Sequence, residues 1–130
     1  VLTPGSEGST FGGYPLAAIT SIYAIKVLID DNLAEKAERK GKYLMQNLYN
    51  IQCKYPNKIK EIRGKGLLTA FEMFNETRLD GHKVSMELIK HGIYVKETHH
   101  TTIRIAPALT IKRNQINKIT DAIEKVIKDL

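Results

Sequence analysis

The apolar positions begin abruptly after a polar, glycine-rich start. Residues 1–13 hold four of the nine glycines and show no apolar period, which is typical of a loop. Residues 15–29 are apolar on nearly all sides, and Pro15 fits the first turn of a helix because its missing N–H needs no partner there. A mostly buried helix is therefore predicted from Pro15 to about Ile29.

A second helix, amphipathic rather than uniformly apolar, is predicted from about Leu33 to Lys54. Its apolar residues recur at helical intervals through the segment. Asn32 followed by Glu35 has the spacing of a capping box, which predicts that the Asn32 side chain caps the first turn.

Short strand patterns follow in the second half of the chain. Residues 58–63 alternate charged and apolar side chains, as a short edge strand does, and residues 67–74 have the composition of a more buried strand. Residues 94–95 and 102–105 are further short candidates. These segments predict a small antiparallel sheet under helices.

Two more helices are predicted around these strands. Asp80 is expected to cap a helix that has His91 in its last turn and Gly92 just beyond it. Another helix begins near Asn114 and carries one apolar stripe to the end of the chain. The expected apolar faces are Val84, Leu88 and Ile89 in the first, and Ile116, Ile119, Ile123, Val126 and Leu130 in the second.

These elements predict an α+β fold class in two parts. Residues 1–30 supply a loop and one helix, and residues 31–130 supply the small antiparallel sheet with its helices. The chain opens with Val1, and no charged segment followed by an apolar one marks a signal peptide. We therefore expect the chain to be a piece of a longer protein.

Composition excludes several classes of protein. The 130 residues are 42% hydrophobic and 26% charged, which is typical of a soluble globular domain and excludes a fibrous or disordered chain. No uncharged apolar run approaches the roughly 20 residues of a membrane-spanning helix, so no membrane association is expected. The one cysteine, Cys53, suits a reducing compartment. We predict the cytoplasm, with the mitochondrial matrix as the alternative.

The net charge of +6 is unevenly distributed. Residues 33–65 carry nine Lys and Arg against three Asp and Glu, and such a basic segment could attract nucleic acid or an anionic membrane. No stacking aromatics or binding motif accompany these lysines, and acidic residues interrupt them. The solvated face of an amphipathic helix is the favoured interpretation, with no nucleic-acid partner; a basic binding module is the alternative.

The glycine-rich loop is the first segment with candidate chemistry. Gly8 to Pro15 ends at a predicted helix start, where backbone N–H groups and the hydroxyls of Ser9 and Thr10 can donate to an oxyanion. This arrangement suits a phosphate. The alternative is a flexible connection, because neither the Rossmann nor the P-loop spacing is present.

The second candidate is Arg104. Within the predicted strand, Ile103 and Ile105 would point into the core while Arg104 faces the other way, and Pro107 ends the pairing. A guanidinium held at a strand end is a rigid two-pronged fork for a carboxylate. The alternative is a structural salt bridge or a solvated arginine.

The histidines predict no metal site. His99 and His100 are adjacent, and adjacent strand residues point to opposite faces of a sheet, so they are not expected to bind one ion. No Ser/His/Asp or Cys/His arrangement for a nucleophile can be identified either.

Three segments, two of which contain the candidate residues, resemble those of a known protein family. They are Gly8–Leu16 (GSTFGGYPL), Arg63–Leu68 (RGKGLL) and Thr102–Pro107 (TIRIAP). In this order and spacing they resemble the C-terminal third of class III (fold type I) pyridoxal-phosphate aminotransferases. The resemblance implies a transaminase with pyridoxal 5'-phosphate as cofactor, amino-acid and 2-oxo-acid substrates, and a homodimer that shares the cofactor site across its interface.

The resemblance also assigns roles to single residues. It implies that Thr10, with Ser9 beside it, binds the cofactor phosphate of the neighbouring subunit. It implies that Arg104 binds the substrate α-carboxylate. Tyr14 departs from the family, which commonly has Asn after the paired glycines.

The same resemblance implies how the chain is divided into domains. Residues 1–30 would be the tail of the large cofactor-binding domain, and residues 31–130 the small C-terminal domain. The Schiff-base lysine and the residues that contact the cofactor ring would all precede Val1. We therefore expect no catalytic residue in this chain and no activity from it alone.

Overall fold

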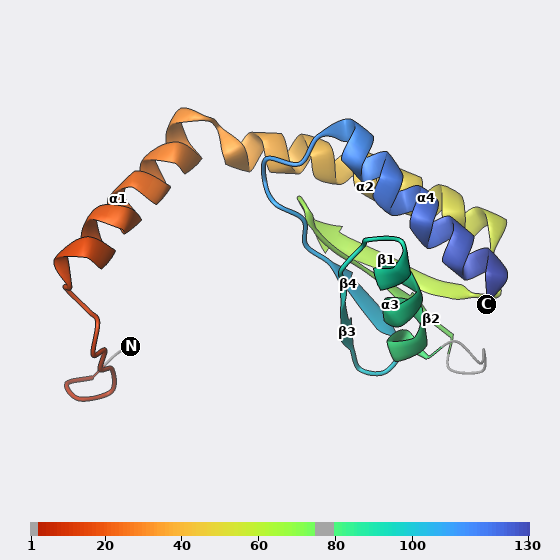
Figure 1. Ribbon diagram of the computed structural model, residues 1–130, viewed down its shortest axis with the longest axis horizontal. Helices are drawn as coiled ribbons and strands as arrows, with labels where there is room; N and C mark the ends of the chain where they lie inside the picture. Colours follow the sequence, from red (N-terminus) through yellow and green to blue (C-terminus); the bar gives the residue numbers. More distant parts are fainter. Residues whose placement is uncertain (1–2, 75–79) are drawn as a thin grey trace. The chain divides into compact units, whose positions relative to one another are not determined.

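The computed structural model describes residues 3–74 and 80–130 (Figure 1). The chain divides into two compact units, Val1–Leu33 and Ala34–Leu130, called unit 1 and unit 2 below. The division falls close to the predicted boundary after residue 30. The described residues form four helices and one four-stranded antiparallel sheet, so the predicted α+β class is confirmed. The assignment of the two units to a large and a small domain stays a prediction.

Unit 1 consists of a loop followed by helix α1, Pro15–Asp30. Pro15 occupies the first turn, as predicted. The predicted burial is wrong: among the described residues, α1 contains none that is buried, and large side chains such as Ile22 and Tyr23 are more than half exposed. A single helix has no second layer within its own unit against which apolar side chains can pack.

The junction between the first two helices also differs from the prediction. Helix α2, Leu33–Lys54, has the predicted bounds, but Asn32 has a φ of 49°, in the left-handed region, and its N–H donates to Ile29 O at 3.0 Å. An N-cap residue normally has an extended backbone, so the predicted capping box is wrong. Asn tolerates the left-handed conformation and turns the chain here.

The sheet of unit 2 has the strand order β1-β2-β4-β3, with neighbouring strands antiparallel. The bounds are Ile59–Lys65 for β1, Leu68–Met73 for β2, Lys96–Thr98 for β3 and Thr102–Ile105 for β4. The last of these is as predicted. The predicted strand at residues 94–95 is wrong: the pairing begins only at Lys96, and the Tyr94 side chain is 84% exposed.

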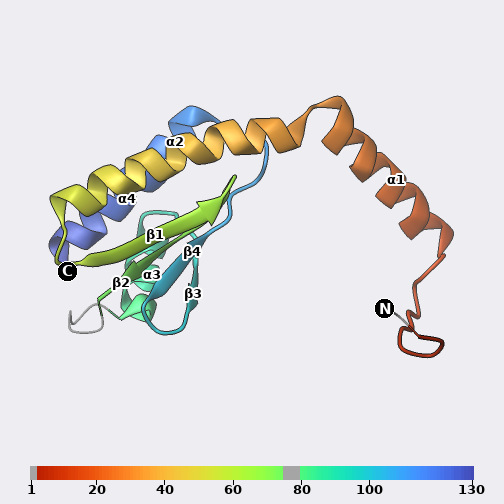
Figure 2. The same ribbon diagram turned by 180° about the vertical axis from the view of Figure 1, so that it is seen from behind.

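Helices α2, α3 (Gly81–Lys90) and α4 (Arg113–Asp129) complete unit 2. Figure 1 shows α3 in front of the sheet and Figure 2 shows it behind, so α3 covers one face; both views show α2 and α4 side by side. The predicted cap of α3 is confirmed, because Asp80 Oδ1 accepts from His82 N–H at 3.1 Å. Ile89 was expected on the buried face but is exposed.

The core of unit 2 lies between these helices and one face of the sheet. Alternation along β4 shows which face: Ile103 and Ile105 are buried and Arg104 between them is exposed. Fully buried side chains include Leu44 and Leu48 of α2, Phe71 of β2, Val84 and Leu88 of α3, and Ile116, Ile123 and Ile127 of α4. The other face of the sheet, called the outer face below, carries Arg104.

Candidate functional site

The glycine-rich loop forms two successive turns before α1. Gly12 N–H donates to Ser9 O at 3.3 Å, and Tyr14 N–H donates to Phe11 O at 3.1 Å. Gly13 has a φ of 78°, which a residue without a Cβ adopts at little cost. A Cβ on Gly12 would lie 3.2 Å from Ser9 Cβ, so this glycine also permits a close approach. The sequence therefore dictates a compact loop that ends directly at the helix start.

The hydroxyls of this loop are available to a ligand. Ser9 and Thr10 are exposed, and within residues 3–74 and 80–130 their side chains make no hydrogen bond. Ser6 differs, because its hydroxyl donates to Thr3 O at 2.7 Å. Each of these two hydroxyls can therefore donate a hydrogen bond to an anion.

The start of α1 adds backbone donors. Tyr14 is the N-cap residue, has an extended backbone and makes no side-chain cap hydrogen bond. Ala18 N–H donates to Tyr14 O, and Pro15 has no N–H, which leaves the N–H groups of Leu16 and Ala17 without an intrahelical acceptor. Hydroxyls and free N–H groups at a helix N-terminus match the donor set that binds phosphate. The loop thus offers the kind of donors that bind a phosphate group.

Arg104 lies on the outer face of the sheet, as predicted. Within the part of the chain that the structure describes, its guanidinium has no ion pair or hydrogen bond, so the predicted alternative of a salt bridge is not seen there. The nearby Arg63 of β1 shows the contrast. It donates to Glu61 at 2.9 Å and to Glu72 at 2.8 Å. Arg104 is therefore held by a central strand while its fork is free to bind a carboxylate.

The loop and Arg104 belong to different units of the chain. Ser9 and Thr10 lie in unit 1 and Arg104 lies in unit 2. Each is described within its own unit, and whether they contribute to one site stays a prediction.

Several cations of the basic segment are paired. Lys60 Nζ lies 2.8 Å from Glu72, and Lys54 Nζ lies 2.8 Å from Glu124. The ammonium of Lys60, followed by the guanidinium of Arg63, lowers the pKa of the Glu72 carboxyl below its ordinary value. Hydrogen bonding to Glu124 raises the pKa of Lys54. Part of the segment's charge is thus neutralised within unit 2, which favours the predicted solvated helix face over a nucleic-acid surface.

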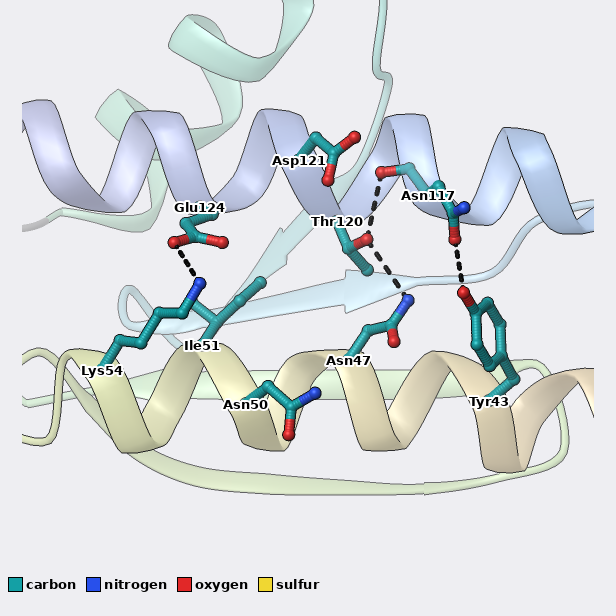
Figure 3. Close-up of a pocket in the computed structure, with 9 residues that line it drawn as sticks. All are labelled: Tyr43, Asn47, Asn50, Ile51, Lys54, Asn117, Thr120, Asp121 and Glu124. Atoms are coloured by element: carbon teal, nitrogen blue, oxygen red, sulfur yellow. Dashed lines mark hydrogen bonds and ion pairs between the residues drawn. The ribbon is translucent and has the colours of Figure 1, made fainter.

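A polar groove of about 290 Å³ lies between α2 and α4 (Figure 3). Tyr43 donates to Asn117 Oδ1 at 2.7 Å, and Asn47 Nδ2 lies 3.5 Å from Thr120 Oγ1. Hydrogen bonding, foremost with Arg113, lowers the pKa of Tyr43. The sequence alone does not predict this polar seam, because only the pairing of the two helices brings its residues together.

The two adjacent histidines lie in a turn. His99 and His100 form the turn between β3 and β4, with φ values of 51° and 62°, rather than strand positions. The described residues hold no group of three or more His, Cys, Asp and Glu side chains that could ligate a metal. None of the described helices combines the length and apolar character needed to cross a membrane.

The chain is similar to known proteins along nearly its whole length. Residues 1–127 match the family model described as aminotransferase class-III. An ornithine aminotransferase of Staphylococcus aureus is 46% identical over 129 residues, which are 99% of this chain and 31% of that relative. The chain therefore spans about a third of the length of the curated relatives that it matches.

Two solved structures are similar in fold. An ornithine aminotransferase from Toxoplasma gondii, crystallised in the presence of oxidized glutathione, shows partial occupancy of PLP at its active site. It matches with a TM-score of 0.85 and 39% identity, over 97% of this chain and 30% of that one. An acetylornithine aminotransferase from Elizabethkingia anophelis matches with a TM-score of 0.84 and 34% identity, over 99% and 34% respectively.

Proposed function

The chain belongs to the class-III aminotransferases, and from this premise we propose that it forms part of an ornithine aminotransferase. The enzyme would move the δ-amino group of ornithine to a 2-oxo acid, giving glutamate semialdehyde and an amino acid. The observation that carries this choice is the 46% identity with an ornithine aminotransferase over 129 residues. Acetylornithine aminotransferase is the second candidate, because one such structure matches at 34% identity; 4-aminobutyrate aminotransferase is a further alternative within the class.

The proposed cofactor is pyridoxal 5'-phosphate, which supplies an electron sink for the amino-group transfer when it is bound. Ser9 and Thr10 would hold its phosphate through their hydroxyls, with the free N–H groups at the start of α1. The support is that these hydroxyls have no other partner among the described residues. The proposed assembly is a homodimer in which this loop serves the site of the neighbouring subunit.

Arg104 would bind the α-carboxylate of the substrates. A bidentate guanidinium fixes the carboxylate in one plane, so the oxo group on the adjacent carbon of a 2-oxo acid is held in one orientation. The strand supports this role, because Ile103 and Ile105 anchor the backbone on either side of Arg104 in the core. Orientation by a rigid element lowers the entropic part of the barrier.

The remainder of the proposed active site would lie outside this chain. None of its lysines lies in a sequence context that resembles the Schiff-base lysine of the family. We propose that the chain alone transfers no amino group and that it acts within a full-length enzyme.

The test uses the full-length enzyme that carries this chain. We expect ornithine to be turned over faster than acetylornithine or 4-aminobutyrate. Arg104→Ala should lower kcat/KM for α-carboxylate substrates by about tenfold or more, as expected when a charged hydrogen-bond pair is lost, and leave the absorption spectrum of the bound cofactor unchanged. Lys125→Ala, at an exposed lysine of α4, is the control. Faster turnover of acetylornithine would contradict the choice of donor, and normal kinetics in Arg104→Ala would contradict the carboxylate role.

A further inference from the structure

A second pocket lies between α2 and α4 and adjoins the polar groove, with which it shares Tyr43. It has a volume of about 310 Å³ and is called the basic pocket below. Its lining consists of Arg39, Lys40 and Tyr43 of α2 together with Arg113 and Ile116 of α4. Three of these side chains are cations and none is an acid, so the pocket is lined by one sign of charge.

Contacts within unit 2 hold two of the three cations in place. The hydroxyl of Tyr43 donates to Asn117 Oδ1 at 2.7 Å, which fixes the aromatic ring (Figure 3). The guanidinium carbon of Arg113 lies 4.2 Å from the centre of this ring, in a cation–π contact that occupies the planar face of the group. Lys40 Nζ donates to Leu109 O at 2.9 Å. The partners of both cations are therefore neutral groups and not carboxylates.

The charge of the basic pocket is unbalanced. Within residues 3–74 and 80–130, none of its three cations forms an ion pair, although Glu35 lies one helical turn before Arg39. Arg113 is also the first residue of α4, whose first turn contains no acid, so its charge lies at the positive end of the helix dipole. By contrast, Lys54 near the other end of α2 pairs with Glu124 of α4. Cations gathered in a concave site without acids create a positive potential that an anion can neutralise.

The donors of the basic pocket fit a phosphate group better than a carboxylate. Arg39 and Lys40 come from one helix and Arg113 from another, so the pocket offers donors from more than one side. A carboxylate has two oxygens in one plane, whereas a phosphate group on an ester has three acceptor oxygens and nearly two negative charges. Ile116 is buried and Tyr43 is half-buried, and both add apolar surface on which the organic part of an ester can lie.

We propose that the basic pocket binds a phosphate group, as the free ion or as part of a small phosphate ester, with Arg113, Lys40 and Arg39 as the donors. The site is separate from the proposed substrate residue, because Arg104 lies on the outer face of the sheet while α2 and α4 cover the core on the other face. It also includes no residue of the unit 1 loop that carries the proposed cofactor donors. The inference therefore goes beyond the proposed function and does not depend on it.

The experiment titrates the full-length enzyme that carries this chain, with its cofactor bound, against phenyl phosphate and inorganic phosphate. Isothermal titration calorimetry in a phosphate-free buffer at constant ionic strength measures the affinity. Arg113→Gln and Lys40→Met should each weaken binding about tenfold or more, as expected when a charged hydrogen bond is lost. Lys125→Met removes one charge from an exposed lysine of α4 outside the pocket. This matched control should change the affinity by less than about twofold, because exposed charges at a distance are screened by salt.

The two probes distinguish the sources of the phosphate group. Tighter binding of phenyl phosphate supports an ester that also contacts the apolar surface, and equal affinities support the free ion. Failure of both probes to bind saturably overturns the inference. So does an equal loss in Arg113→Gln and Lys125→Met, because overall charge alone would then attract the anion. Loss of binding in Thr10→Ala but not in Arg113→Gln would place the titrated anion at the unit 1 loop and also overturns it. Because these measurements record binding and not turnover, the inference can fail while the proposed function holds, and the reverse.

Discussion

Units 1 and 2 differ in how far their apolar side chains are buried and in how far their polar groups are paired. Helix α1 of unit 1 is the most uniformly apolar segment of the chain, yet none of its described residues is buried. Helix α4 of unit 2 is polar on average, yet Ile116, Ile123, Val126 and Ile127 are buried. The polar groups differ between the units in the same way: among the described residues, the hydroxyls of Ser9 and Thr10 in unit 1 have no hydrogen-bond partner, while Glu72 bonds two cations within unit 2.

The difference shows that periodicity and overall hydrophobicity carry separate information. A single stripe, as on α4, predicts burial against the element's own neighbours, because one face alone needs to be covered. A helix that is apolar on all sides, as α1 is, needs packing partners on several of its faces. The described residues of unit 1 form α1 and a loop, which cannot bury all of these faces. Groups left open in this way are available for contacts beyond the unit.

The largest difference between the units is expected in the free energy of unfolding when one leucine in each unit is replaced by alanine. Leu48→Ala removes a fully buried side chain of α2 and should lower the free energy of unfolding of unit 2 by about 2 to 5 kcal/mol. Leu28→Ala on α1, where the side chain is 45% exposed, is the matched control and should change it by less than about 0.5 kcal/mol. Denaturant unfolding of the chain, followed by circular dichroism, measures both.

Equal losses for the two leucine variants would break the comparison. They would mean that α1 is packed in solution as firmly as α2, so that the exposure of its side chains is not a property of the chain. A small loss for Leu48→Ala would contradict the core assignment instead.

An intermediate effect is expected at the loop of unit 1. Thr10→Ala removes a hydroxyl that we assign to the cofactor phosphate, and in the full-length enzyme it should weaken pyridoxal phosphate binding by about 1 to 3 kcal/mol. Ser6→Ala is the control, because that hydroxyl is already hydrogen-bonded to Thr3. Equilibrium dialysis of the cofactor measures both. Unchanged affinity in Thr10→Ala would count against the phosphate role, whereas the unfolding of unit 2 should be unaffected in either variant.

The sequence predicted elements whose signals are local. Asp80 caps α3 and β4 has the expected bounds, because a cap and an alternation of buried and exposed residues depend on neighbours in the chain. The exposure of Arg104 follows from the same alternation. The candidate loop of Ser9 and Thr10 could likewise be proposed from its glycines and hydroxyls.

Features set by pairing or by a missing neighbour could not be predicted. Lys96 lies beside Arg104 because His99 and His100 make a tight turn with positive φ, and histidine carries none of the turn signal that Asn-Gly would. The exposure of α1 was missed because an all-round apolar sequence does not say which element covers it. The spacing of Asn32 to Glu35 predicts a cap, but spacing alone does not reveal the backbone conformation of Asn32.

The smallest effect is expected when a charge that unit 2 balances internally is removed. The pKa of Glu72 is lowered in the folded state by Lys60 and then Arg63, so the carboxylate stabilises the fold fully above its ordinary pKa and loses this contribution as pH falls through the lowered value. Glu72→Gln should therefore unfold more easily than the parent near neutral pH, and the two unfolding curves should converge in acid. Glu7→Gln, at an exposed acid of the unit 1 loop, is the control and should show no such convergence. Thermal unfolding between neutral and acidic pH measures the difference, and parallel curves for the parent and Glu72→Gln would show that this ion-pair cluster does not stabilise unit 2. In that case the paired charges of unit 2 and the unpaired hydroxyls of unit 1 would no longer differ in what they contribute to folding.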